Sequence, residues 1–458
     1  MHSEEQFRIP APVMHVMNKI EEAGYQAWLV GGCVRDLLRH KEPHDYDLAT
    51  SARPQIIQQL FKKHADTGLK HGTVMVIEEG IPIEVTTFRK EGTYSDGRHP
   101  DQVEFVDDIQ EDLARRDFTV NAMAWNPENG LLDPFGGQKD LEEGIIRAVG
   151  DPDRRFEEDA LRMIRAWRFA AQLGFRIEEQ TLKALHKEDN TARIEKISAE
   201  RIFEELNKIL MSDHPEVIAE MTDLLWPWIP ELKIMLECDQ INPHHYTDVL
   251  HHTLDAIRRS GSDDPMVRFA LLLHDAGKPA TKTTDARGDH FKKHPIESAK
   301  IARRVLRRLH APKKWQEEIP ALILRHDAFY APNLSNIAKL RITLGWDDEQ
   351  VQKLFEVQRG DILAHTSFER LDLLKEFRDF YDLEKSRRPL SVGELAVNGH
   401  DVMEHTSLRN RQIGLALEKL LMLAFYHPEL NRREDLLARL PQIEAQVLSE
   451  QNRAGDKK

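Results

Sequence analysis

The chain has 458 residues, of which 40% are hydrophobic and 31% are charged. A chain of this length is too long to fold around one ordinary hydrophobic core, so we expect two to four globular domains. No apolar run is long enough to cross a bilayer, and the first residues carry no signal-peptide pattern, so we expect no membrane association. The only cysteines are Cys33 and Cys238, which excludes a disulfide framework and indicates a cytoplasmic protein. The net charge of −14 argues weakly against a nucleic-acid partner, although local patches decide such binding.

Strand and helix patterns change along the chain. Short β-branched or alternating runs indicate strands within residues 25–30, 45–50, 73–79 and 81–88, and helical periodicity dominates from about residue 150. We therefore expect an α+β fold, with a small mixed sheet in the N-terminal part and helices thereafter. The expected domains are residues 1–148, residues 149–243, a histidine-rich helical segment at 244–365, and a helical tail at 366–458.

Two aspartates in the segment DYDLAT suggest a metal site. Asp45 and Asp47 are two residues apart, so on a strand they share one face, and Mg²⁺ would offset their charge. The preceding motif GGCVRD reads as a strand–helix turn, in which Gly32 allows a close approach of phosphate and Arg35 can bind it. Glu84 lies on the strand at 81–88, on the face opposite to Ile83 and Val85, and is either a third metal-site carboxylate or part of a solvated face.

Arginines gather in two later segments. EDLARRDFTVNAMA contains Arg116 and Asp117, and arginine forks suit triphosphate or ribose. The segment EEDALRMIRAWRF places acidic and basic residues three apart, which on one helix aligns the first three of Asp159, Arg162, Arg165 and Arg168. The alternatives are an ion-pair ladder and a site that reads nucleobases. One carboxylate with one guanidinium matches the Watson–Crick edges of cytosine and adenine and repels those of guanine and uracil.

Seven motifs occur in order between about residues 20 and 210, and together they resemble the class II CCA-adding enzymes of the DNA polymerase β superfamily. They are GGCVRD, DYDLAT, TGLKHGTVMV, EVTTFR, EDLARRDFTVNAMA, DPFGGQKDLEEGIIRAVGD and RFEEDALRMIRAWRFAAQLGF. The resemblance implies a polymerase-β-like head, a helical neck and body, and a tail that contacts tRNA. It implies template-independent addition of CCA to tRNA from CTP and ATP with Mg²⁺.

The resemblance also assigns roles to individual residues. Asp45 and Asp47 would bind Mg²⁺, with Glu84 as the third acid. Triphosphate or ribose would be held by Gly32, Arg35, Arg116 and Asp117. Asp159 and Arg162 would read the base, supported by Arg165 and Arg168. The loop at residues 89–105 has full length, which favours CCA addition, and an enzyme that adds only A is the alternative.

A second constellation lies downstream and consists of His252, the dipeptide His274–Asp275 in the motif HDAGK, and the distant Asp361. Residues of these types in this order resemble the HD phosphohydrolase superfamily. Its expected ligands are His252, His274, Asp275 and Asp361, and His294 and His326 would extend the site to a second metal. Imidazole and carboxylate ligands suit Ni²⁺, Mn²⁺ or Co²⁺. Nearby lysines are candidate phosphate contacts or simply solvated: Lys278, Lys282, Lys292 and Lys293. The domain is either a phosphohydrolase or an inactive scaffold. A rival interpretation of the whole chain is an HD-type nucleotide-sensing protein with a degenerate head.

Overall fold

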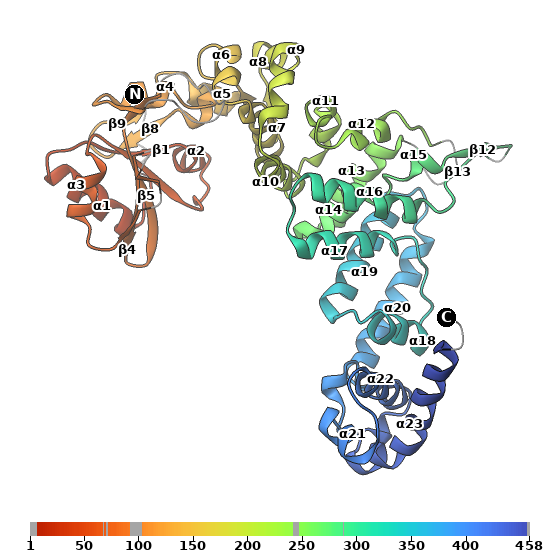
Figure 1. The fold of residues 1–458 in the computed structure, drawn as a ribbon. Coiled ribbons are helices and arrows are strands. Elements are labelled where there is room, and N and C mark those ends of the chain that lie inside the picture. The colour runs from red at the N-terminus through yellow and green to blue at the C-terminus, as the bar shows by residue number, and fades with distance from the viewer. Residues whose placement is uncertain are drawn as a thin grey trace. The chain divides into compact units, whose positions relative to one another are not determined.

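The computed structural model describes residues 7–66, 68–69, 72–91, 103–240, 247–286 and 288–455. The chain forms two compact units, coloured in chain order in Figure 1. The first consists of Met1–Lys233 and Arg307–Ala311, and the second of Ile234–Leu306 and Pro312–Lys458. The boundaries of the four domains expected from the sequence remain predictions.

The first unit contains a seven-stranded sheet in the order β3-β4-β5-β2-β1-β8-β9. The strands β2 and β5 pair in parallel, and the other neighbours are antiparallel, so the sheet is mixed, as expected for an α+β fold. The strands are β1 (Ala27–Val30), β2 (Tyr46–Thr50), β3 (His64–Ala65), β4 (Thr73–Glu78), β5 (Ile81–Thr87), β8 (Ala124–Asn126) and β9 (Gly130–Leu132). All four strand predictions are confirmed. A separate hairpin pairs β6 (Arg89–Glu91) with β7 (Val103–Phe105), and the rest of the loop expected at 89–105 lies outside the described residues.

The two faces of this sheet bury different side chains. One face packs under α1 (Ala11–Glu22) and α3 (Pro54–Leu60), with Leu29, Leu48 and Val85 in its core. The other face holds Trp28 and Ala49 in a smaller cluster with residues of α4 (Ile109–Ala114). Because side chains alternate along a strand, Asp47 next to Leu48 points away from the larger core. The expected division of β5 is confirmed, since Ile83 and Val85 are buried whereas Pro82 and Glu84 are exposed.

The rest of the first unit is mainly helical. After α2 (Gly32–Leu38) and α4, its elements are α5 (Gly137–Glu143), β10 (Ile145–Ile146), α6 (Pro152–Glu158), α7 (Leu161–Leu173), β11 (Arg176–Ile177), α8 (Glu179–Leu185), α9 (Glu188–Thr191), α10 (Ala199–Leu210), α11 (Thr222–Leu225) and the start of α12 (Pro230–Leu236). The prediction that Asp159 shares one helix with Arg162 and Arg165 is wrong. Asp159 is extended, with φ −147° and ψ 106°, and its carboxylate accepts a hydrogen bond from the Leu161 backbone N–H, which interrupts the helix.

The second unit is built from helices, with one short hairpin of β12 (Thr283–Asp285) and β13 (Gly288–His290). Its first helices are α13 (Val249–Ser260), α14 (Pro265–Leu273), α15 (Lys278–Thr281), α16 (His294–Arg308), α17 (Lys313–Ile323), α18 (Leu334–Ala338) and α19 (Asp348–Leu363). The helices α13, α14 and α19 pack against one another, and α17 covers α14. This packing brings side chains from distant parts of the sequence to one buried point.

The last helices are α20 (Glu369–Lys385), α21 (Gly399–His405), α22 (Arg411–Tyr426) and α23 (Arg433–Gly455). The helices α21, α22 and α23 share a separate apolar cluster that includes Val402, Leu420 and Leu440. Within the described ranges, no helix combines the length and apolar character needed to span a bilayer.

Candidate functional site

Three carboxylates lie near one another at β2 and β5, on the side of the sheet that faces away from the larger core. In the parallel pair of β2 and β5, Asp47 lies directly beside Glu84, and Asp45 precedes β2 by one residue. Burial and the charges of Asp45 and Glu84 raise the pKa of Asp47 to about 6, although the guanidinium of Arg116 opposes the shift. Mutual repulsion of this kind favours a bound cation, and carboxylate oxygens suit Mg²⁺.

The turn before α2 brings a guanidinium next to these carboxylates. Gly31 has φ +76°, and a Cβ there would lie 2.8 Å from Nη1 of Arg116 and 3.9 Å from Oδ2 of Asp47. Gly32 is the residue expected to allow a close approach of phosphate, and the missing side chain of the preceding Gly31 makes room for the guanidinium of Arg116. The carboxylate of Asp112 holds Arg116, with 3.3 Å from Nη2 to Oδ2. A phosphate above this turn would meet a guanidinium and a carboxylate-bound cation together.

A group of arginines surrounds one aromatic ring in the first unit. The guanidinium carbons of Arg35, Arg165 and Arg168 lie 5.6, 5.3 and 3.9 Å from the ring centre of Phe169. Burial and the neighbouring Arg165 lower the pKa of Arg168 to about 10, although its ion pair with Glu205 raises it. Such a concentration of positive charge suits an anionic ligand of high charge.

Two of these arginines are positioned by acidic or amide partners. Arg35 donates from Nε to Asp36 at 2.9 Å and from Nη1 to Asn121 at 2.8 Å. Arg165 donates from Nε and Nη2 to Oδ2 of Asp117, at 2.8 and 2.5 Å. Burial raises the pKa of Asp117, but the charge and hydrogen bonds of Arg165 outweigh it and hold the pKa at about 2. Asp117 therefore supports Arg165.

The expected pair of Asp159 with Arg162 does not form between their side chains. Arg201, on α10, donates from Nη1 and Nη2 to the two carboxylate oxygens of Asp159, at 3.2 and 2.6 Å. Arg162 donates instead to Glu158 at 2.6 Å and to the Arg115 carbonyl at 3.0 Å. The two residues are three positions apart in the sequence, and each side chain binds a different partner. Arg201 was missed because it lies on another helix, 42 residues downstream.

The second unit buries a compact group of imidazoles and carboxylates. Nε2 of His252 and of His274 lie 3.1 and 3.3 Å from Oδ1 of Asp361. The same two nitrogens lie 3.6 and 3.2 Å from Oδ2 of Asp275. The potential ligand atoms of these four residues all lie within 4.8 Å of one another. All four residues expected as the first metal set are therefore together, and they come from α13, the end of α14 and α19.

A second group shares one of these carboxylates. Nε2 of His294 and of His326 lie 3.2 and 3.8 Å from Oδ1 of Asp275, and the two nitrogens lie 3.2 Å apart. Oδ2 of Asp275 faces His252 and His274, so its carboxylate bridges both groups. Two metal ions with one bridging carboxylate would use all six residues.

The imidazoles are oriented for ligation by their other ring nitrogens. Nδ1 of His274, His294 and His326 lies 2.6, 2.8 and 2.7 Å from the backbone carbonyl three residues earlier. A donating Nδ1–H leaves Nε2 free of a proton and aimed at the carboxylates, as in metal ligation. Burial lowers the pKa of His274, but Asp275 and Asp361 outweigh it and raise the pKa to about 10. The two carboxylates of the cluster therefore favour a bound cation, either a proton or a metal ion.

The nearby lysines differ in their surroundings. Lys278 is buried, lies 2.7 Å from Asp275 and donates to Gln240 at 2.8 Å. Lys282 pairs with Asp289 at 3.0 Å, whereas Lys292 and Lys293 are exposed. Sequence reasoning missed His365, whose ring stacks on His252 at 5.3 Å and whose Nε2 lies 3.5 Å from Asp361. His365 lies two residues after the end of α19, and its spacing of four residues from Asp361 was the available signal.

Within the part of the chain that the structure describes, the two histidine groups are the only sets of three or more potential metal ligands this close together. The carboxylates of Asp45, Asp47 and Glu84 are more widely spaced than that. Carboxylates without a cation repel one another, so their spacing does not exclude a role in binding Mg²⁺.

Family comparisons match three parts of the chain. The family described as "Poly A polymerase head domain" matches residues 27–147, "Probable RNA and SrmB- binding site of polymerase A" matches residues 174–235, and "HD domain" matches residues 244–344. The first match includes the three carboxylates of the sheet. The last includes five of the six clustered ligands and ends before Asp361.

Two curated relatives of the chain are named CCA-adding enzymes. The CCA-adding enzyme of Lactiplantibacillus plantarum is 53% identical over 210 residues, which cover 46% of this chain and 51% of that protein. The CCA-adding enzyme of Leuconostoc mesenteroides subsp. mesenteroides is 49% identical over 278 residues, which cover 59% of this chain and 68% of that protein. The chain spans about half the length of several curated relatives that it matches.

Two solved structures of CCA-adding enzymes align with most of the chain. The Bacillus stearothermophilus CCA-adding enzyme in complex with CTP aligns with a TM-score of 0.65 and 29% identity, over 98% of this chain and 100% of that chain. The Thermotoga maritima CCA-adding enzyme complexed with tRNA aligns with a TM-score of 0.55 over 95% of this chain and 96% of that chain. At 23% identity, the latter similarity supports the fold alone.

Proposed function

The chain belongs to the family of CCA-adding enzymes, as its motifs indicated, and we propose that it extends the 3′ end of tRNA with CTP and ATP without a nucleic-acid template. The 3′-hydroxyl would attack the α-phosphorus of the nucleotide, and the bond to pyrophosphate would break. Full CCA addition is favoured over addition of A alone, because the relatives and the structural neighbours above are CCA-adding enzymes. A nucleotide sensor with a degenerate head is not favoured either.

The observation that carries this proposal is the juxtaposition of Asp47, Glu84 and Arg116 above the Gly31 turn. In this assignment Asp45 and Asp47 hold Mg²⁺, Glu84 is the third acid, and Gly32 belongs to the turn under the phosphates. Bound Mg²⁺ would neutralise charge on the triphosphate and the attacking oxygen. Arg116 would meet the phosphates directly, and the cluster of Arg35, Arg165 and Arg168 would add to the attraction.

We propose that Asp159 and Arg162 read the incoming base. The bidentate contact from Arg201 fixes the Asp159 carboxylate in one orientation. A fixed acceptor beside a guanidinium matches the amino donor and ring-nitrogen acceptor of cytosine and adenine. Because their side chains have separate partners in the structure, Arg162 must leave Glu158 or share it when a base binds.

The test is nucleotide incorporation into tRNA that lacks CCA, with labelled CTP and ATP supplied separately and together. We expect two C residues and one A with both nucleotides, and no activity in Asp47→Asn. The matched control is Asp107→Asn, whose side chain is 85% exposed and should add CCA normally. Extension only of tRNA that already ends in CC would identify an A-adding enzyme. Binding of CTP and ATP without any incorporation would support the sensor instead.

We further propose that the second unit is a metal-dependent phosphohydrolase. The bridging carboxylate of Asp275 and the oriented imidazoles of His274, His294 and His326 support a transition-metal site for Ni²⁺, Mn²⁺ or Co²⁺. A bound metal would supply a nucleophilic water at neutral pH. Hydrolysis of a 2′,3′-cyclic phosphate would add water at phosphorus, break one P–O bond, and pass a proton to the leaving ribose oxygen.

The hydrolase test compares 2′,3′-cyclic nucleotides and simple phosphomonoesters with each metal. His274→Ala and Asp275→Ala should lose hydrolysis yet still add CCA. No hydrolysis with any metal, together with no metal bound by metal analysis, would make the unit a scaffold.

We also propose the division into a head (1–148), neck and body (149–243), HD domain (244–365) and tail (366–458) that contacts tRNA. A cytoplasmic location is supported by the free, buried thiols of Cys33 and Cys238.

A further inference from the structure

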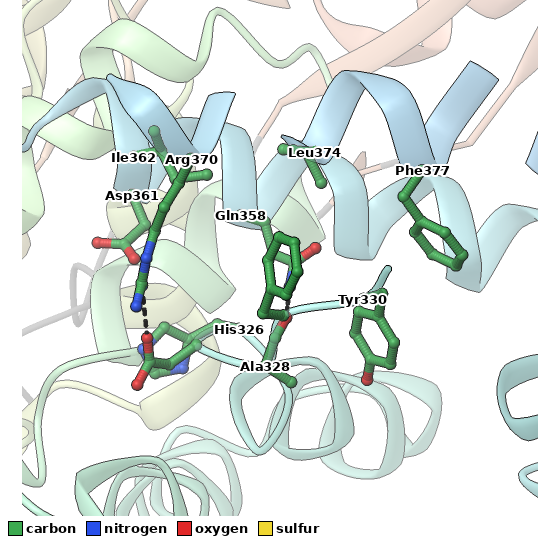
Figure 2. A pocket seen from close by; sticks show the side chains of 11 residues that line it. His326, Ala328, Tyr330, Gln358, Asp361, Ile362, Arg370, Leu374 and Phe377 are labelled. Atoms are coloured by element: carbon green, nitrogen blue, oxygen red, sulfur yellow. Dashed lines mark hydrogen bonds and ion pairs between the residues drawn. The ribbon is translucent and has the colours of Figure 1, made fainter. Parts of the chain in front are cut away.

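A pocket opens directly beside the histidine–aspartate cluster of the second unit (Figure 2). Its enclosed volume is about 30 Å³, and it is partly open to solvent. His326 and Asp361 belong both to the cluster and to the wall of this pocket. A ligand whose phosphate lies at the cluster would therefore extend its other end into the pocket.

The far part of the pocket is aromatic. The rings of Tyr330 and Phe377 stack at 5.5 Å with an interplanar angle of 20° and form a buried wall, seen on the right of Figure 2. Phe329 also lines the pocket, yet 54% of this residue is exposed. A large exposed aromatic side chain at the mouth of a pocket suits a planar ligand group that stacks on it.

One polar group in the wall lacks a partner. Gln358 is 5% exposed, and its Nε2 donates to the carbonyls of Ala328 and Arg325 at 2.6 and 3.3 Å. These two bonds fix the orientation of the amide, because only the amino end can donate. Its Oε1 is buried and accepts no hydrogen bond within the described part of the chain. A buried acceptor without a partner costs free energy unless a ligand donates to it.

The acceptor lies on the same helix as one residue of the cluster. Gln358 and Asp361 are three residues apart on α19, so they share a face and are separated by about 5 Å along the axis. Arg370 and Asp327 lie across the same pocket and are joined by a hydrogen bond of 2.9 Å, drawn as a dashed line in Figure 2.

We propose that this pocket selects the base of the hydrolase substrate, and that it takes a nucleobase with an exocyclic amino group. The base stacks on Phe329, and its amino group donates to Oε1 of Gln358. Adenine and cytosine carry such a donor opposite the ribose, whereas purine and pyrimidin-2-one lack it. The inference rests on the proposed hydrolase function for the position of the phosphate, but base binding itself requires no metal.

Binding is measured first, on the full chain in EDTA, where neither hydrolysis nor nucleotide addition can occur. Ligand-observed NMR compares adenosine with purine riboside, and cytidine with pyrimidin-2-one riboside, since each pair differs only by the amino group. We expect about tenfold weaker binding without the amino group, the effect of one hydrogen bond to a buried acceptor. Phe329→Ala should weaken adenosine and cytidine binding about tenfold through lost stacking.

Leu383→Ala is the control. Leu383 lies on α20 of the second unit, is 48% exposed and does not line the pocket. It should bind as the unchanged protein does. Hydrolysis of the four corresponding 2′,3′-cyclic phosphates with Mn²⁺ should then show the same order in kcat/KM. Gln358 itself is left intact, because its amide supports the loop at 325–328.

The outcomes separate this inference from the hydrolase proposal. Equal binding within each pair, or binding unaffected by Phe329→Ala, overturns the inference even if hydrolysis occurs. Hydrolysis that is absent with every metal, together with amino-selective binding that Phe329→Ala weakens, supports the pocket and overturns the hydrolase. Selective binding and selective hydrolysis support both.

Discussion

Replacing Asp117 by Asn tests how strongly the buried carboxylate holds Arg165. Asn has nearly the same shape and can still accept from the Phe118 backbone N–H, which donates to Asp117 at 2.9 Å. It cannot supply the negative charge that faces both donors of Arg165. The substitution therefore removes charge with little change in packing, and it leaves a guanidinium without its counter-charge.

The magnitude follows from the pKa of Asp117, which lies at about 2 in the folded protein and at 3.8 as its ordinary value. That difference corresponds to about 2.4 kcal/mol at 1.36 kcal/mol per pH unit. Because the folded pKa is depressed, the contribution is complete above pH 3.8 and is lost as the pH falls through about 2. We expect Asp117→Asn to lower the unfolding free energy of the first unit by about 2 to 3 kcal/mol at pH 7.

The assay is urea unfolding at pH 7, 5, 4 and 3, followed by tryptophan fluorescence, since Trp28, Trp125 and Trp167 lie in this unit. Asp107→Asn is the control, because that carboxylate is 85% exposed and should change stability by less than about 0.5 kcal/mol. The double variant Asp117→Asn with Arg165→Met should recover part of the loss. A loss below about 0.5 kcal/mol at pH 7, or one that stays constant down to pH 3, would refute the reasoning.

Three further outcomes are expected. Below pH 6 a proton competes for Asp47, whose pKa is raised to about 6, so the Mg²⁺ concentration for half-maximal nucleotide addition should rise up to about tenfold per pH unit; a flat dependence between pH 5 and 7 would contradict the assignment. Arg201→Ala frees the Asp159 carboxylate and should raise UTP incorporation relative to CTP about tenfold, and Arg201→Lys should raise it by a smaller factor. Unchanged selectivity in polymerisation assays would show that Arg201 contributes to stability and not to the choice of base. Saturating Mn²⁺ or Ni²⁺, at about 100 times the dissociation constant, should stabilise the second unit by about 2.7 kcal/mol in calorimetry. EDTA or His274→Ala should abolish this increment. An identical melting temperature with and without metal would show that the cluster binds no metal.

Local patterns were sufficient for four strands of the sheet but not for the helices around Asp159. Alternating residues in β5 predicted which side chains are buried, because one face of a strand must cover a core. Periodicity alone carried the helix prediction through Asp159, and it contains no information on side-chain capping. The carboxylate of Asp159 bonds the backbone of Leu161 instead, and this local competition with the helix decides the break.

The candidate sites show the same division between local and long-range information. The spacing of HDAGK and the distant Asp361 predicted four ligands that the fold brings together. The partners that orient functional side chains were not predictable, because Arg201, Asn121 and Asp112 reach their targets only through tertiary packing. Gly31 and Gly32 were indistinguishable without the backbone torsion that separates them.

The parallel pairing of β2 with β5 constrains where the chain tolerates insertions. Residues between the two strands form an excursion through α3, β3 and β4, and loop residues added there lengthen a connection without moving the pair. One residue inserted within β5 before Ile83 would shift the alternation and turn Ile83 outward and the carboxylate of Glu84 inward, against Leu29 and Leu48. The distance in sequence from Asp47 to Glu84 is therefore free to vary, but the parity of positions along β5 is not.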